Sequence, residues 1–205
     1  PFFAWIPTKM IEATFRNSTQ YGYMPTSPDG NLFKRWHAPN PAVNVFRLND
    51  DLMTDKIYSD KEAIDSGHTE AQIFFGRKSH IIHVEPISEK HPFLKCLQNF
   101  VRKWGAPLRL LGDHAGNQSS FQVMDYLRML WIGFWQSEPY YQHQNMFERR
   151  YQTFKRTVNR LMDRTGTPGE LWYHCMLYVA YVLNRVSDPS LNDRQPIFAA
   201  TGQIG

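Results

Sequence analysis

Cysteine is almost absent from this chain, which has only Cys96 and Cys175 among its 205 residues. Each lies within an apolar pattern typical of a helix, so the sequence offers neither a disulfide framework nor a cysteine-based zinc site. So little cysteine suits a reducing compartment, and we expect no bound zinc.

Long hydrophobic runs are missing as well. The most apolar stretches, such as residues 175–183, are far shorter than the ~20 residues with which a helix spans a bilayer. The first residues show no charged segment followed by an apolar one, as a signal peptide would. We therefore expect no membrane partner. The chain also begins with Pro1 instead of Met, which suggests a piece of a longer polyprotein.

Acidic residues are slightly outnumbered, since 19 Asp and Glu stand against 23 Lys and Arg, for a formal net charge of +4. So small an excess is compatible with a nucleic-acid partner but does not identify one. The distribution is more informative, because residues 146–164 hold six bases and only two acids. Phosphate neutralisation by such a segment would make binding strongly salt-dependent.

Proline divides the chain into parts. Six of the 13 prolines fall within residues 1–50, where no periodic segment survives. We interpret residues 1–50 as a proline-rich arm or linker that is poorly ordered. Residues 55–187 are expected to fold as one core, with residues 188–205 as a C-terminal extension.

Strand-like and helix-like segments alternate beyond residue 55. The predicted strands are residues 56–64, 71–75, 80–87, 108–113 and 133–136. The predicted helices are residues 89–104 with Ser88 as N-cap, residues 119–131, a helix that carries Glu148, and a last helix opened by a capping box over residues 167–170. This order of elements predicts a mixed α/β fold.

The helix that carries Glu148 has the clearest pattern. Apolar residues recur at intervals of four and three and predict one buried stripe: Phe147, Tyr151, Phe154, Val158 and Leu161. A second line lies about 100° round the helix: Glu148, Gln152, Lys155 and Asn159. We therefore expect Glu148 in the first turn, at the border of the core.

Three carboxylates predict a metal site. Two-metal phosphoryl transfer needs hard oxygen ligands that converge on cations about 3.5 to 4 Å apart. Asp suits strands, whose neighbours lie about 4.8 Å apart, and the longer Glu can reach from a packed helix. We predict Asp60, Asp113 and Glu148 as the ligands, with Asp55 and Asp65 as rival first ligands. Taken singly, each could be an ordinary solvated or turn residue.

Short motifs occur in one order along the chain. They are YSD at residues 58–60, GDHAG at residues 112–116, EPYYQHQNMFER at residues 138–149 and QPIFAATGQ at residues 195–203. These motifs resemble those of the catalytic core of copia-type LTR retrotransposon integrases, which are retroviral-like integrases with an Asp, Asp, Glu triad. The resemblance covers residues 55–204. It implies an RNase H-like α/β fold, with a mixed five-stranded sheet and helices on both faces.

The resemblance also implies a function. The enzyme would insert element DNA into host DNA by 3′-end processing and strand transfer, with two Mg²⁺ or Mn²⁺ ions held by Asp60, Asp113 and Glu148. Its partners would be double-stranded DNA, as element ends and target, and further copies of itself in a homo-oligomer. It would act in the nucleus, which it reaches from cytoplasmic particles. The residues expected to contact DNA are Asn145, Arg149, Gln152, Lys155, Arg156, Asn159 and Arg160.

The motifs depart from the usual pattern in three places. His114 and Ala115 replace an Asn and a Gly, Gln142 replaces a Pro, and one glycine of the third motif is missing. The spacing between Asp113 and Glu148 is therefore one residue short. A shorter loop would leave the glutamate in register, whereas a rotated helix would turn it away. Two alternatives stay open: a nuclease that does not join strands, or an inactive derivative that serves as a DNA-binding or interaction module.

Overall fold

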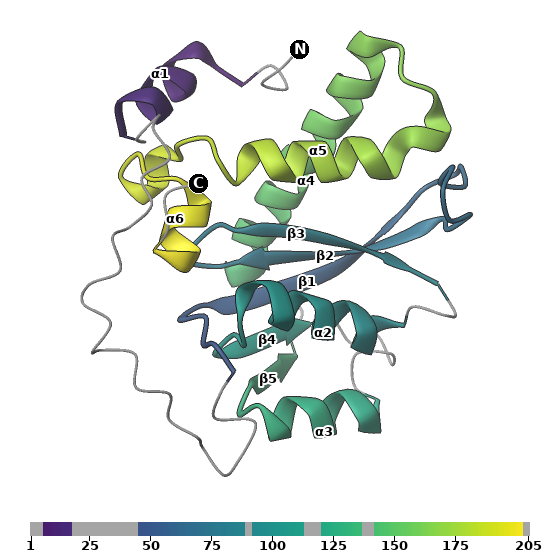
Figure 1. The fold of residues 1–205 in the computed structure, drawn as a ribbon, viewed down its shortest axis with the longest axis vertical. Coiled ribbons are helices and arrows are strands. Elements are labelled where there is room, and N and C mark those ends of the chain that lie inside the picture. The colour runs from purple at the N-terminus through teal and green to yellow at the C-terminus, as the bar shows by residue number, and fades with distance from the viewer. Residues whose placement is uncertain (1–5, 18–44, 89–91, 113–119, 137–141, 203–205) are drawn as a thin grey trace, which may run out of the picture.

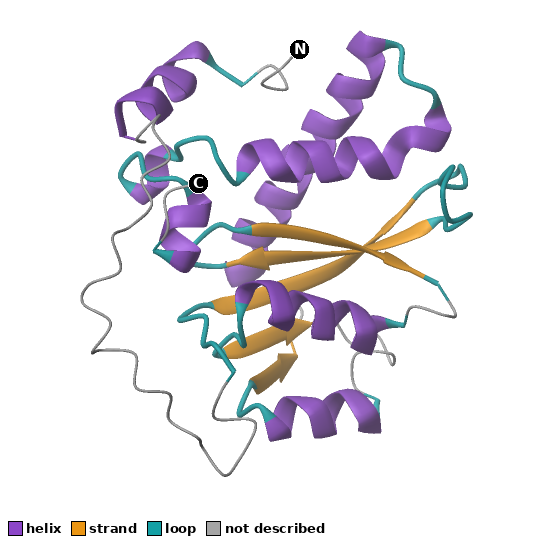
Figure 2. Ribbon diagram, in the orientation of Figure 1, coloured by secondary structure: helices purple, strands orange, loops and turns teal. Residues whose placement is uncertain are grey.

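One mixed five-stranded β-sheet lies at the centre of the molecule (Figures 1 and 2). The computed structural model describes residues 6–17, 45–88, 92–112, 120–136 and 142–202, without the side chains of 136 and 142–147. The strands are β1 (Asp51–Tyr58), β2 (Glu70–Gly76), β3 (Ile82–Ile87), β4 (Arg109–Gly112) and β5 (Gly133–Gln136). Their order is β3-β2-β1-β4-β5, where β1, β2 and β3 are antiparallel and β4 and β5 run parallel to β1.

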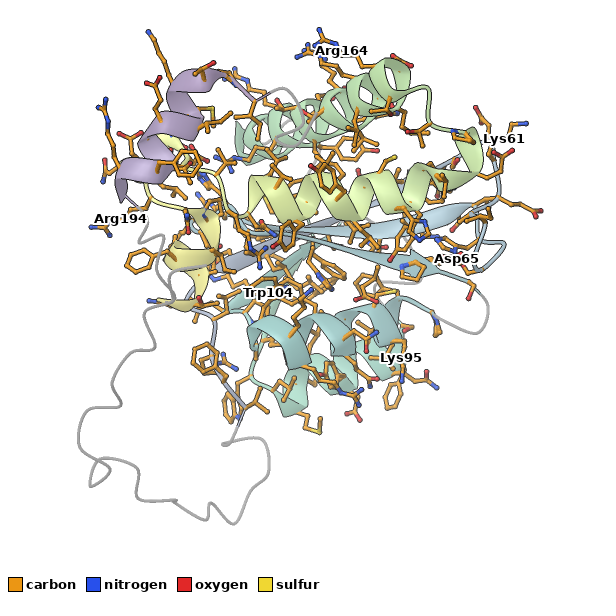
Figure 3. The ribbon with its side chains drawn as sticks, turned by 45° about the horizontal axis from the view of Figure 1, so that its top comes forward. Lys61, Asp65, Lys95, Trp104, Arg164 and Arg194 are labelled. Carbon is orange, nitrogen blue, oxygen red and sulfur yellow. The ribbon has the colours of Figure 1, made fainter. Side chains whose placement is uncertain are left out.

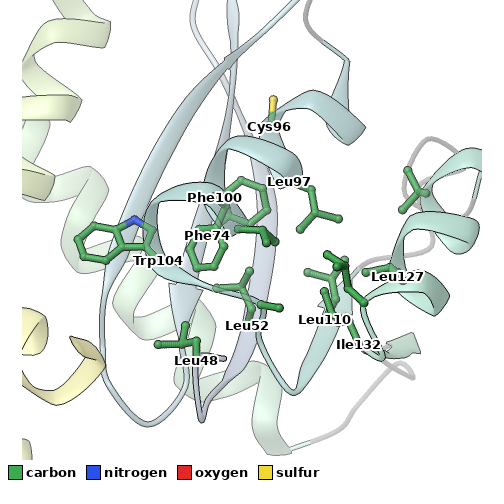
Figure 4. Packing of buried hydrophobic residues seen from close by; sticks show 14 of the residues in the cluster. Leu48, Leu52, Phe74, Cys96, Leu97, Phe100, Trp104, Leu110, Leu127 and Ile132 are labelled. Carbon is green, nitrogen blue, oxygen red and sulfur yellow. The ribbon is translucent and has the colours of Figure 1, made fainter. Parts of the chain in front are cut away.

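Side chains on the two faces of the sheet form two hydrophobic cores. In β2, Ile73 and Phe75 belong to one core and Phe74 to the other, as the strand period of two requires. Helices cover both faces: α4 (Gln142–Thr165) and α5 (Trp172–Leu183) pack on the first core, and α2 (Phe93–Trp104) and α3 (Phe121–Met129) on the second. Figure 4 shows the second core, with Phe74 beside Phe100. The predicted fold class is confirmed.

The first strand lies earlier in the chain than predicted. The prediction was residues 56–64, whereas β1 ends at Tyr58 and pairs with β2 from Leu52 to Tyr58. The pattern was misleading because polar residues, Asp51, Thr54, Asp55 and Lys56, interrupt a largely buried strand. As a result, Asp60 lies outside the sheet.

Two helices also begin later than predicted. Pro92, not Ser88, is the N-cap of α2, which begins at Phe93. Proline suits a helix start because its fixed φ is compatible with the helix and its missing N–H would have no intrahelical partner. The predicted capping box is absent, since the short 3-10 helix η3 (Gly169–Leu171) leads into α5 without a side-chain cap. Within the described ranges, no helix is long and apolar enough to cross a membrane.

Parts of both predicted appendages pack against the core. The helix α1 (Thr8–Asn17) is attached at Ser187, whose N–H donates to Thr14 Oγ1 at 2.6 Å and whose hydroxyl donates to the Met10 carbonyl at 3.0 Å. Leu48 is 1% exposed in the second core. The proline-rich composition of residues 1–50 did not predict this helix, because tertiary contacts stabilise it more than its intrinsic helix propensity does. In the C-terminal extension, Ile197 of α6 (Pro196–Thr201) packs on the second core. Residues 18–44 lie outside the described part.

A buried carboxylate shapes the turn between β2 and β3. Asp50 is 2% exposed and accepts hydrogen bonds at 2.8 Å from the backbone N–H groups of Lys78 and Ser79. The turn ends at His80, which has a φ of 64°, in the left-handed region that few non-glycine residues adopt. Asp50 therefore fixes a turn that presents the His80 ring toward α4 and the C-terminal segment.

An ionic network around that ring joins three parts of the chain. His80 Nδ1 lies 2.6 Å from Asp188 Oδ2, and the Arg150 guanidinium lies 2.8 Å from His80 Nε2 and 3.6 Å from Asp188 Oδ2. The Ser190 N–H also donates to Asp188 at 2.9 Å. Burial alone would raise the pKa of Asp188, but the hydrogen bonds from His80 and Ser190 hold it well below its usual range.

Replacement of Asp188 by Asn should destabilise the fold by about 2 kcal/mol at pH 7, because it removes hydrogen bonds to a charged group. Since the folded-state pKa lies below the unfolded value of about 3.9, the stabilisation is present above that pH and is lost as the pH falls further. Urea unfolding of wild type and D188N at several pH values measures this. The difference should shrink below about pH 4.

Asp65→Asn is the matched control. Asp65 pairs with His174 at 2.7 Å, but both side chains are largely exposed, so the pair should contribute at most about 1 kcal/mol. An equal loss in D65N and D188N would show that the network of Asp188 contributes nothing beyond a surface ion pair.

Candidate functional site

Asp60, the predicted first ligand, lies outside the sheet. It is exposed and lies two residues beyond the end of β1. A cavity that it lines is also lined by Lys155 and Asn159 of α4. These positions lie about 10 and 16 Å along the helix from Glu148, at 1.5 Å per residue. Asp60 therefore shares this cavity with residues from the middle of α4.

Asp55, a rival first ligand, lies within β1 on the face that α4 covers. Its neighbour two residues on, Ile57, and its cross-strand partner, Ile73, both belong to the first core. Side chains alternate along a strand, so Asp55 shares that face. Burial raises the pKa of Tyr151 on α4, and the negative charge of Asp55 raises it further. Asp55 thus lies close to the helix that carries Glu148.

Glu148 is exposed on α4, in the second turn instead of the predicted first, because the helix begins at Gln142. Tyr151 follows three residues later, and side chains at i and i+3 are neighbours on a helix surface. Glu148 therefore neighbours Tyr151, the residue whose pKa the charge of Asp55 raises. Three residues of the predicted stripe are buried: the exposed fractions are 1%, 6% and 7% for Phe154, Val158 and Leu161. Tyr151 is partly buried.

Asp113 lies outside the described residues, but its position in the sequence relates it to Asp55. It follows Gly112, the last residue of β4. Met53 pairs with Leu111 in the parallel β1–β4 ladder. In the sequence Asp113 follows the last residue of β4, and Asp55 lies on the neighbouring strand β1, two residues beyond Met53.

The donor chemistry fits a hard divalent cation. Carboxylate oxygens are the ligands that Mg²⁺ prefers. Among the described residues, no three His, Cys, Asp or Glu side chains form a group that could hold a metal ion. Asp55 and Glu148 supply two carboxylates from facing elements, and Asp113 would be the third. Asp65, the remaining rival, is paired with His174.

Four cations on α4 are free for a polyanion. They are exposed and form no ion pair within the described residues: Arg149, Lys155, Arg156 and Arg160. Arg150 differs, because Asp188 neutralises it. Gln152 and Asn159 are exposed as well, whereas the side chain of Asn145 is not described. Glu148 therefore borders a cationic surface, which suits a reaction at a phosphate.

The sequence did contain a signal for Asp55. Met53 and Ile57 stand two residues to either side of it, and both are buried. Apolar residues at this period of two predict a strand that passes through Asp55. The predicted strand, residues 56–64, was centred on the YSD motif and therefore left out Met53 and Asp55.

Comparisons with solved structures identify the fold. The catalytic core domain of BIV integrase matches with a TM-score of 0.58 and 14% identity over 75% of this chain and 95% of that one. The HTLV-2 integrase catalytic core, solved with magnesium in a trimeric form, matches with a TM-score of 0.57 and 12% identity over 76% and 99%. A simian T-cell lymphotropic virus intasome chain matches with a TM-score of 0.59 and 9% identity over 76% and 57%.

No family model matches the sequence, and no curated protein does either. At such low identity the structural likeness shows the fold alone. The order of strands, the helices on both faces and the extent of the match agree with one another. The chain therefore has the RNase H-like fold of retroviral integrase catalytic cores.

Proposed function

We propose that this chain is the catalytic core of an integrase from a copia-type LTR retrotransposon, which joins element DNA to host DNA. One observation carries the proposal: Asp55 lies on the face of the sheet that α4 covers, and its charge acts on Tyr151, three residues after Glu148 on that helix. The third carboxylate, Asp113, follows directly on the neighbouring strand β4. The motifs around Asp113 and Glu148 supply the specificity of the assignment.

The proposed ligand set is Asp55, Asp113 and Glu148, with Asp55 in place of Asp60. A pair of Mg²⁺ or Mn²⁺ ions bound there would activate a 3′-hydroxyl and stabilise the leaving oxygen of a phosphodiester. The HTLV-2 core was solved in complex with magnesium, which supports a divalent metal. Asp55 lies on a strand and Glu148 on a helix that packs on the same face of the sheet, which supports this ligand set.

The proposed partner is double-stranded DNA, as element ends and target, bound along the cationic surface of α4. Contacts are proposed for the exposed side chains Arg149, Gln152, Lys155, Arg156, Asn159 and Arg160, and for Asn145. The retroviral relatives in fold include a trimeric form and an intasome, which supports a homo-oligomer. Action on host chromosomal DNA would place the protein in the nucleus.

Asp55→Asn and Glu148→Gln should each lower Mg²⁺-dependent nicking and joining of a duplex oligonucleotide about a hundredfold or more. Loss of a metal ligand removes several kcal/mol of charge stabilisation, and each 1.36 kcal/mol is tenfold in rate. DNA binding should stay within a few-fold. Asp163→Asn, an exposed acid on the same helix, is the activity control.

Mn²⁺ calorimetry in the presence of a DNA end separates the two candidate first ligands. D55N and E148Q should lose metal binding, whereas D60N should bind Mn²⁺ as wild type does. Metal loss in D60N but not in D55N would return the first ligand to Asp60. DNA binding without metal binding in the wild type would favour the inactive DNA-binding derivative, and cleavage without joining would favour a nuclease.

The charge-neutralising double variant Arg156→Gln with Arg160→Gln should weaken the salt dependence of DNA binding. Each lost phosphate contact lowers the slope of log K against log[salt] by about 0.9, so the slope should fall by up to about 1.8. Lys9→Gln with Arg16→Gln removes the same charge from exposed positions of α1 and should leave the slope unchanged. Equal changes in both pairs would mean that only net charge matters.

A further inference from the structure

The YSD motif, which the metal site does not use, borders a cavity of about 350 Å³. The cavity lies between the end of β1, the middle of α4 and the start of α5. Its inner wall is apolar and buried, and includes Phe154, Val158, Trp172 and Met176. Its rim is polar or exposed: Tyr58, Ser59, Asp60, Lys61, Lys155 and Asn159. Its size is at the lower end of the about 300–1,000 Å³ of small-molecule sites.

We propose that this cavity receives one unpaired nucleobase of the DNA strand, while the flanking phosphates contact Lys61 and Lys155. The inference rests on the proposed function, because it names the part of the DNA that this region recognises. A flat aromatic base suits an apolar wall, since bases extruded from a duplex are held by stacking and by hydrogen bonds to their edges. Tyr58, also at the rim, is 66% exposed.

The two lysines at the rim carry uncompensated charge. Within the described residues, neither Lys61 nor Lys155 has a carboxylate partner. The stem of Lys61 lies over Gly169, where an added Cβ would come within 3.2 Å of Lys61 Cγ. In Figure 3, Lys61 lies beside the start of α5. A backbone phosphate on each side of the base would meet one of these ammonium groups.

Rim side chains would also distinguish between bases. The Asp60 carboxylate only accepts hydrogen bonds, and the Asn159 amide both donates and accepts. An acceptor favours a base with an exocyclic amino group, as in adenine or cytosine, over thymine, which has none. This gives Asp60 a role in recognition in place of the predicted role as a metal ligand.

The position of the cavity along α4 is compatible with a DNA strand that also reaches the proposed metal site. Lys155 comes seven residues after Glu148, about 10 Å along the helix. A DNA strand advances about 3.4 Å per nucleotide, so the base would lie about three nucleotides from the phosphate at the proposed metal site. One strand could therefore reach both places at once.

The test is equilibrium binding in EDTA, so that metal chemistry plays no part. The probes are duplex oligonucleotides with a single bulged adenine, cytosine or thymine, or an abasic bulge at the same position. Wild type should bind bulged adenine and cytosine about tenfold more tightly than the abasic duplex, because the abasic site has no base to stack in the cavity. The affinity for the thymine bulge should exceed that for the abasic duplex by a smaller factor. Asp60→Ala should remove the preference for amino-bearing bases, because alanine has no side-chain acceptor.

Arg156→Gln is the matched control outside the cavity. It should weaken all four duplexes by a similar factor, because a phosphate contact is indifferent to the base. Equal affinity of wild type for the adenine and abasic bulges would overturn the proposal. The proposal would also be overturned if the protein bound free dAMP but bound the base-bulge and abasic duplexes equally well. The occupant of the cavity would then be a free nucleotide.

The outcome for the cavity is separable from the outcome for the proposed chemistry. If a base preference that depends on Asp60 occurs in a protein without Mg²⁺-dependent chemistry, the cavity is supported and the enzymatic assignment fails. If D55N and E148Q lose activity but base and abasic DNA bind equally, the enzymatic assignment is supported and the cavity proposal fails.

Discussion

The packing of α4 against β1 sets the geometry of the proposed site. Phe154, Val158 and Leu161 are buried against the sheet, and only one rotation of the helix buries all three. Full burial of each such side chain contributes about 1.5–3 kcal/mol, which exceeds the strength of most surface electrostatic interactions. The same rotation places Tyr151 near Asp55 and so fixes where Glu148 lies. The position of Glu148, a proposed ligand, is therefore a consequence of hydrophobic packing.

This constraint explains how α4 tolerates the shortened third motif. The missing residue lies between Asn145 and Glu148, N-terminal to the buried part of the stripe. Everything from Tyr151 onward keeps its register with the sheet, so the glutamate keeps its face.

Sequence reasoning recovered the elements with strong periodicity and missed those that depend on contacts. The stripe of α4 and the antiparallel pairing of β2 with β3 follow from local patterns. The helix α1 could not be predicted in the same way, because Ser187 stabilises it from 173 positions away. For the site, Glu148 follows from helix geometry. The exchange of Asp60 for Asp55 required the true strand boundary, which cross-strand pairing fixes and a three-residue motif does not.

The ionic network around His80 connects the first turns of α4 to the C-terminal segment. Among the described side chains of α4, the first fully buried one is Phe154, so the earlier turns need other contacts. Arg150 supplies them, since it binds His80 in the β2–β3 turn and Asp188 after α5. Glu148 lies two residues before Arg150. The segment that composition marks as an extension therefore helps to hold the proposed ligand in place, and its removal would affect the presentation of Glu148 as well as stability.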